Sequence, residues 1–229
     1  MKKYITIAAL LSAGTALANA ESIVTTFSSA LSGKTPTEVV LEIAGAPEGT
    51  TGKVSSLTKA DGTEISLRTV TGKEDGTFLA PDTNVGSAQG WKSVFEYTFS
   101  GETIIVSGVT LNVGIFSGGN TWQGVNTNRD FVFEVGLGDK TITSENWTVQ
   151  GNGTQTPGNG AVTLSFDDAV ELTDSATFSL SVSKGTSNPG CFLGLHSVEF
   201  SVIPEPSAFG MLAGLGALAL VASRRRRRK

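Results

Sequence analysis

From residue 22 to residue 202, hydrophobic and polar positions alternate with a period of two in one segment after another, and no stretch repeats its apolar residues at helical spacing. Such alternation is typical of β-strands that bury one face and expose the other. The predicted strands cover residues 37–45, 63–70, 93–100, 103–116, 130–137, 160–167, 176–183 and 191–202. This part of the chain is therefore predicted to be all-β.

The segments between these strands are rich in the turn-forming residues Gly, Asn, Asp and Pro. Three strands place apolar residues on one parity, where they should line a core between two sheets: Phe131, Phe133, Val135 and Leu137; Val162, Leu164 and Phe166; Phe178, Leu180 and Val182. Short strands and polar turns without an internal repeat predict one antiparallel β-sandwich over residues 21–203, with a jelly roll as its expected form.

The last predicted strand changes its parity halfway. Leu193 and Leu195 share one side, whereas Val198 and Phe200 share the other, so one extra residue must lie near His196 and Ser197. We expect a β-bulge or a strand break at this position. Such a bulge either aims a side chain toward a site or simply kinks a strand near the edge of its sheet.

The first twenty residues have the three parts of a secretory signal peptide. Two lysines form a basic start, residues 5–18 are apolar, and Ala18 and Ala20 supply a small-residue cleavage site. The apolar run is shorter than a typical membrane span, so residues 1–20 should form a signal helix that is removed before Glu21. The expected partners are the Sec export machinery and signal peptidase, and an uncleaved anchor is the alternative.

With both ends set aside, the composition is strongly acidic. Residues 21–202 hold 9 Lys and Arg residues against 20 Asp and Glu residues, a formal charge of −11, whereas the whole chain has −4. A surface of this sign repels polyanions, so nucleic acid is not expected as a partner. Cys191 is the only cysteine, which excludes an intrachain disulfide and leaves a buried thiol or an intermolecular contact.

The C-terminal end combines a rigid peptide, an apolar segment and a basic tail. Pro204 and Pro206 hold the backbone around Glu205 extended, so the sequence PEPS neither continues a sheet nor begins a helix. Residues 208–223 are uncharged and would form a transmembrane helix of about 24 Å, slightly shorter than the hydrocarbon core. The basic residues 224–229 should remain cytoplasmic and place PEPS across the membrane.

This order of elements, over residues 204–229, resembles the PEP-CTERM sorting signal. In that family the signal is read by exosortase, a membrane enzyme with a cysteine nucleophile that is thought to cut near the motif and pass the protein to the envelope or the polymer matrix. The resemblance implies exosortase as a partner and a transient anchor in the inner membrane. The residues of the implied processing site are Pro204, Glu205, Pro206 and Ser207. A plain single-pass anchor is the alternative.

The segment LGLHSVEFSV before the motif is similar to an ending common in that family, in which the last jelly-roll strand carries an Asp-Asn pair. The likeness implies a lectin-like or galactose-binding-like sandwich. His196 and Ser197 stand in place of the pair, so a calcium site that used the Asp is not implied for this chain.

Few residues of the sandwich suit catalysis, and we expect no enzyme. His196 is the only histidine, and the motifs of serine hydrolases, zinc proteases and paired-cysteine metal sites are missing from the sequence. A pair of carboxylates across a cleft, as in glycosidases, would leave no such motif. Asp167 and Asp168 are weak candidates for calcium ligands, because no calcium-loop spacing surrounds them, and no other metal or cofactor is expected.

A loop around Trp122 is the predicted carbohydrate site. It combines an aromatic ring with amide and guanidinium groups, which can stack on a sugar ring and bond its hydroxyls. The candidate residues are Asn120, Trp122, Gln123, Asn126, Asn128 and Arg129. The alternative is that Trp122 caps the core, and Trp91 and Trp147 are further candidates for either role.

These observations predict an exported protein of the cell envelope, the cell surface or the extracellular matrix, with a structural or adhesive role. A lectin-like module that binds extracellular polysaccharide is the alternative, and a glycan-active enzyme is a third hypothesis. Because the sandwich is acidic, we expect any ligand to be neutral or cationic.

Overall fold

The computed structural model describes residues 22–28, 34–68, 78–85, 90–116, 129–149, 160–185 and 192–203. The strands in these ranges are β1 (Ser22–Phe27), β2 (Leu41–Ala44), β3 (Thr51–Lys59), β4 (Trp91–Thr98), β5 (Ile104–Phe116), β6 (Arg129–Leu137), β7 (Lys140–Thr143), β8 (Trp147–Val149), β9 (Ala161–Leu172), β10 (Ser175–Lys184) and β11 (Phe192–Ile203). A short 3-10 helix, η1 (Pro36–Glu38), precedes β2. The prediction that this part of the chain is all-β is confirmed.

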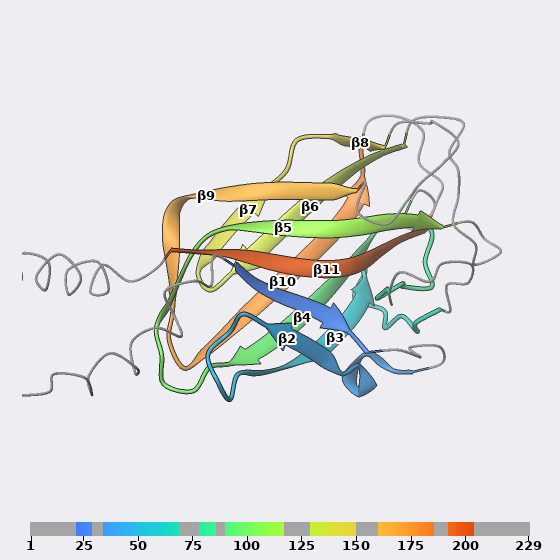
Figure 1. Cartoon of the computed structure of the whole chain (residues 1–229). Helices are drawn as coiled ribbons and strands as arrows, with labels where there is room; N and C mark the ends of the chain where they lie inside the picture. The colour runs from blue at the N-terminus through green and yellow to red at the C-terminus, as the bar shows by residue number, and fades with distance from the viewer. Residues whose placement is uncertain are drawn as a thin grey trace, which may run out of the picture.

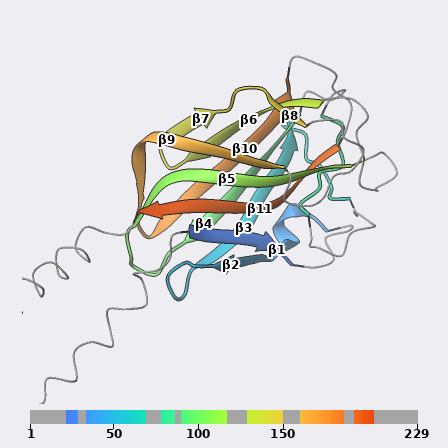
Figure 2. The same cartoon turned by 45° about the horizontal axis from the view of Figure 1, so that its top comes forward.

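The strands form two antiparallel sheets that face each other (Figure 1). One sheet has the order β2-β1-β11-β5-β9; the other has the order β3-β4-β10-β6-β7, with β8 also paired to β6. Between the described strands the chain crosses from one sheet to the other at β2/β3, β4/β5, β5/β6, β8/β9, β9/β10 and β10/β11. The turned view in Figure 2 shows the same two layers, and the predicted antiparallel β-sandwich is confirmed.

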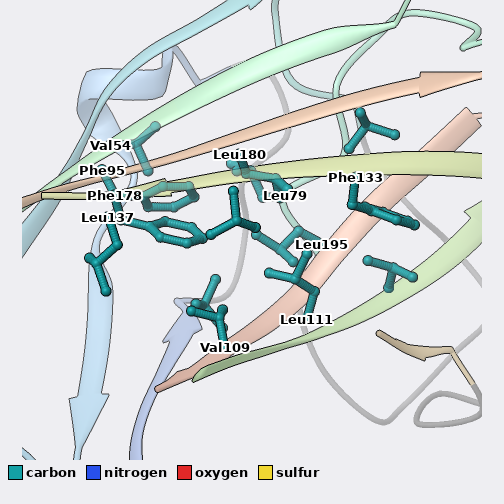
Figure 3. Close-up of a cluster of buried hydrophobic side chains, with 14 of the residues drawn as sticks. Val54, Leu79, Phe95, Val109, Leu111, Phe133, Leu137, Phe178, Leu180 and Leu195 are labelled. Carbon is teal, nitrogen blue, oxygen red and sulfur yellow. The ribbon is translucent and has the colours of Figure 1, made fainter. Parts of the chain in front are cut away.

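The core lies between the sheets and is filled by alternate residues of the facing strands. Along β10, for example, Phe178 and Leu180 are fully buried, and the ring of Phe178 lies 5.4 Å from the ring of Phe95 on β4. Figure 3 shows these side chains in one cluster with Val109 and Leu111 of the opposite sheet. Burial of each such side chain stabilises the fold by roughly 1.5–3 kcal/mol. The predicted inward-facing residues are buried, and Phe166 is partly buried.

The bulge expected in the last strand is present. The pairing of β11 with β5 shifts between Leu195 and Ser197, so His196 is the extra residue. Leu195 before the shift and Val198 after it are both fully buried, because the extra residue keeps the apolar side of the strand on the core. One of the two interpretations placed this strand near the edge of its sheet. The strand lies instead in the middle of the sheet, because β1 pairs along its other side.

The predicted strand at residues 37–45 is shorter in the structure. Proline at position 36 favours the first turn of a helix, and the backbone amide of Thr35 donates a hydrogen bond of 2.7 Å to the carboxylate of Glu38. This local bonding closes η1, and the ladder begins only at Leu41.

The predicted strand at residues 63–70 is not formed in its described part. Glu64 pairs with Thr58 and Leu67 pairs with Pro81 as isolated bridges. Ile65 is nevertheless buried, as is Leu67, because the segment lies against the core without a continuous partner strand. Alternation in this segment therefore indicated burial and not a ladder.

The two ends of the described chain lie next to each other. Ser22, the first residue of β1, is opposite Ser201 near the end of β11. Figure 1 shows both strands side by side in the same sheet. The segments that precede β1 and follow β11 are therefore joined to the same end of the sandwich.

Candidate functional site

The predicted carbohydrate loop falls almost entirely outside the described residues. Asn120, Trp122, Gln123, Asn126 and Asn128 are in this group, whereas Arg129 begins β6 and is partly buried. The backbone of Arg129 is paired with Val149 of β8. The Trp122 site therefore stays a prediction.

The other two tryptophans belong to the core. Trp91 is only 1% exposed and lies at the start of β4. Trp147 packs against the core, with its ring 5.7 Å from the ring of Phe133 and 6.3 Å from the ring of Phe131. Neither ring is therefore placed as an open stacking platform.

The two weak calcium candidates lie on the edge strand β9. The pairing of β9 with β5 shifts between Ser165 and Val170, and Asp167 and Asp168 occupy the irregular part with exposed side chains. Within the described ranges, no group of three or more His, Cys, Asp or Glu side chains could hold a metal ion. Charged side chains and a bulge are common on sheet edges, where they oppose pairing with another chain. Calcium binding stays a prediction.

A hollow of about 460 Å³ lies over the outer face of the sheet β3-β4-β10-β6-β7. The strand register brings one outward-facing residue from each strand into a single row. This row consists of Thr58, Lys92, Ser181, Glu134 and Thr143. Four strand spacings give the row a length of about 19 Å. We call these five residues the polar row.

The polar row follows from the alternation along each strand. In β10 the even-numbered residues from 176 to 182 are buried apolar side chains, so the odd-numbered residues face outward. All of these outward residues carry hydroxyl groups: Ser175, Thr177, Ser179, Ser181 and Ser183. The same alternation turns Lys92 of β4 and Glu134 of β6 to the outside, where both are exposed.

The backbone beside the hollow has a close approach that requires glycine. Gly90 precedes β4 with a φ of +93°, and a Cβ atom there would lie 1.9 Å from the carbonyl oxygen of Val182. The missing side chain lets the start of β4 lie close to β10, where both strands line the hollow.

The polar row has charges of both signs and no internal partners in the described structure. Lys92 and Glu134 lie on either side of Ser181, about 10 Å apart between their Cα atoms. None of the five side chains makes a hydrogen bond or an ion pair with another described residue, which leaves their polar groups available to a ligand. Elsewhere on this face, Lys53 is paired with Glu96 at 2.8 Å, and this hydrogen bond lowers the pKa of Glu96.

The sequence pattern did not identify the polar row. Its members lie on strands that are far apart in the chain, and only the strand order and register place them together. The available signal was the run of hydroxyl residues at every second position of residues 175–183. That signal indicates a polar face but not its neighbours.

Comparison with known proteins identifies one segment. The family description PEP-CTERM protein-sorting motif matches residues 202–228, beginning inside β11. A search of curated protein sequences found no match. In the described part of the chain, no helix is long and apolar enough to cross a membrane, and the predicted membrane segment 208–223 and the signal residues 1–20 lie outside that part.

Several solved structures show a distant similarity. One is the tryptic core variant of Cry1Da from Bacillus thuringiensis, with 11% identity over 72% of this chain and 26% of that chain and a TM-score of 0.36. A second is a family 35 carbohydrate-binding module from an environmental isolate, with 14% identity over 65% of this chain and 96% of that chain and a TM-score of 0.32. A third is the family 32 module of C. perfringens NanJ in complex with galactose, with 11% identity over 64% of this chain and 92% of that chain and a TM-score of 0.29. The alignment therefore spans only about a quarter of the Cry1Da core. At these TM-scores the similarity says nothing about function.

The family match confirms the predicted resemblance at the C-terminal end, including the segment from Pro204 to Ser207. Those residues lie outside the described structure. The chain thus carries a PEP-CTERM sorting motif, which marks it as an exported protein with a membrane-anchoring sorting signal at its C-terminal end.

Proposed function

We propose that this chain is a structural or adhesive protein that exosortase processes and delivers to the cell envelope, the cell surface or the extracellular matrix. The observation that carries the proposal is the sorting motif at residues 202–228. The motif begins at the end of β11, so the sandwich is the part of the protein that would be delivered. The proposal assigns no catalytic activity to it.

The sandwich itself is proposed to be a jelly roll. With β2, β3 and β8 left aside, the remaining strands pair first with last, second with second-last and so on: β1 with β11, β4 with β10, β5 with β9, and β6 with β7. This nested pairing supports the jelly-roll assignment. Such a fold is stabilised by its core without a disulfide, which suits a domain whose sequence has one cysteine.

Export by the Sec machinery and cleavage by signal peptidase complete the proposed route. The adjacency of Ser22 and Ser201 supports it, because both segments to be removed are attached at one end of the sandwich.

Mass spectrometry of the protein from native envelope material tests the proposal. The mature form should lack residues 1–20 and the residues beyond the PEP segment, and a strain without exosortase should retain the protein in its inner membrane. A matched variant with Pro204→Ala and Pro206→Ala should be retained in the same way. An intact SRRRRRK peptide in mature envelope material would instead show a permanent anchor.

Carbohydrate binding is the second candidate function, favoured by the hollow over the sheet β3-β4-β10-β6-β7. Its exposed hydroxyl, ammonium and carboxylate groups are the kinds of group that bond sugar hydroxyls. An array of glycans probed with the mature protein tests this function. Binding to a defined set of glycans supports it, and a blank array rejects it.

A further inference from the structure

We infer that the hollow over the polar row is the binding site for a neutral polysaccharide chain, with Lys92, Ser181 and Glu134 as its central hydrogen-bonding groups. The inference rests on the second candidate function and gives that function a location and a ligand class. It places the site on the face of a sheet, separate from the loop around Trp122.

The chemistry of the polar row matches a polyhydroxylated ligand. A sugar hydroxyl both donates and accepts hydrogen bonds. The Lys92 ammonium only donates, the Glu134 carboxylate only accepts, and the Ser181 hydroxyl between them does both. Successive hydroxyls of one sugar chain can therefore be satisfied along the row.

The size and shape of the hollow suit a short stretch of chain. A volume of about 460 Å³ lies within the usual range of small-ligand sites, roughly 300–1,000 Å³. The polar row is elongated, since it crosses five strands from Thr58 on β3 to Thr143 on β7. A linear polymer lying across the strands would use this length.

The position of β10 argues against a peptide as the ligand. Its backbone is already paired with β4 on one side and with β6 on the other. A peptide binding as an added strand needs a free sheet edge, and the hollow lies over the middle of the sheet. Recognition there must use side chains, and the side chains of the polar row are hydroxyl, ammonium and carboxylate groups.

The charges favour a neutral sugar over an acidic one. Lys59 and Lys92 line the hollow and would attract an anion, but Glu134 lies within the row and would repel it. The charge of −11 over residues 21–202 adds to that repulsion. A neutral chain experiences neither effect.

The test uses the mature protein, exported and purified with its own signals. An array of neutral and uronate-rich polysaccharides identifies binding, and calorimetry then gives Kd. Lys92→Met and Glu134→Gln should each raise Kd about 10- to 100-fold, because each removes the charge from a charge-assisted hydrogen bond to the sugar. Lys53→Met is the matched control, because Lys53 lies on the same face but is paired with Glu96. This variant should bind the glycan with the Kd of the parent protein.

Each outcome has a separate meaning. Both substituted residues of the row are exposed, so thermal unfolding should show that the variants fold as the parent does. If both row variants bind the glycan with unchanged Kd, the proposed site is wrong but carbohydrate binding stands. Loss of glycan binding in Trp122→Ala would then place the binding site at the loop around Trp122. A preference for uronates would overturn the neutral ligand class, and a blank array would overturn the second candidate function itself.

Discussion

Alkaline pH should destabilise the sandwich through one buried tyrosine, Tyr97 of β4. Its side chain is only 2% exposed and packs against the rings of Phe99 and Phe200. The hydroxyl donates a hydrogen bond of 3.1 Å to the Oγ1 atom of Thr25, which is also fully buried. Burial raises the pKa of Tyr97 far above its usual value, and the hydrogen bond between Tyr97 and Thr25 lowers it by less.

The direction and size of the effect follow from proton linkage. In the unfolded chain, tyrosine loses its proton at about pH 10, whereas the buried residue keeps it to a higher pH. Above about pH 10 the unfolded state therefore binds fewer protons than the folded state, and the free energy of unfolding falls by about 1.4 kcal/mol for each pH unit. A rise of two pH units would lower the free energy of unfolding by about 3 kcal/mol, which is a large part of the roughly 5–15 kcal/mol typical of a folded domain.

The sequence makes the assay unusually specific. The chain has two tyrosines, Tyr4 in the signal segment and Tyr97, so tyrosinate absorbance of the mature protein reports Tyr97 alone. Urea unfolding at a series of pH values gives the stability, and the absorbance should rise only as the protein unfolds.

Tyr97→Phe supplies the comparison. The variant loses the hydrogen bond to Thr25 and should be less stable by about 1 kcal/mol at neutral pH. Its stability should fall less steeply above about pH 10, and because the two proteins differ only at residue 97, the difference in slope isolates Tyr97. Equal slopes, or tyrosinate absorbance that appears near pH 10 in the folded protein, would refute the reasoning.

Three further changes test the packing and the edges of the fold. Gly90→Ala should lower the free energy of unfolding, measured in urea, by at least about 2 kcal/mol, because the new Cβ would lie 1.9 Å from the carbonyl oxygen of Val182. Gly62→Ala is the control: its Cβ would meet nothing within 4 Å, and it should lower the same free energy by only about 1 kcal/mol. Phe178→Ala should lose about 3–5 kcal/mol by the same measurement, and a loss below about 1 kcal/mol would contradict the core described above. Replacing Asp167 and Asp168 by Val should increase self-association through the edge of β9, measured by sedimentation. If calcium instead raises the Tm of the parent protein but not of this variant, the calcium prediction is supported.

The sequence pattern is clearest in the strands whose buried and exposed residues alternate regularly. Over residues 131–137 of β6 and residues 176–182 of β10 every second residue is apolar and buried, so the period of two is visible without the structure. In β3 it is not, because the register with β4 shifts between Val54 and Ser56, and the buried residues Val54 and Leu57 are three positions apart. A bulge thus moves the hydrophobic residues out of phase while the strand continues.

β1 was missed for a different physical reason. Its inward-facing residues are Ile23, Thr25 and Phe27, and the polar Thr25 interrupts the apolar pattern. Thr25 is tolerated in the core because its hydroxyl is bonded to Tyr97, a residue 72 positions away. Only the tertiary structure supplies that partner. β7 and β8 are simply too short to show a pattern.

The candidate site was harder to predict than the fold, because it depends on register. Alternation predicts that Glu134 and Ser181 face outward, but it does not say that they are neighbours. That contact depends on which residue of β6 is opposite each residue of β10, and a slip by one position would turn the other face of the strand outward. The sorting motif was recognisable for the opposite reason, since it is a linear signal read along consecutive residues.

The junction between β11 and the motif limits where the sorting cut can fall. Val202 and Ile203 pair with Val106 and Ile105 of β5, so they belong to the ladder of a central strand. Pro204 lacks the N–H group needed to continue the ladder, which agrees with the end of the strand at Ile203. A cut before Val202 would remove pairing from the middle of the sheet, whereas a cut after Ile203 would leave it complete. The C-terminal residue of the mature protein, measured by mass spectrometry, should accordingly lie at or beyond Ile203, and a terminus at or before Ser201 would show that the sandwich is released in an altered form.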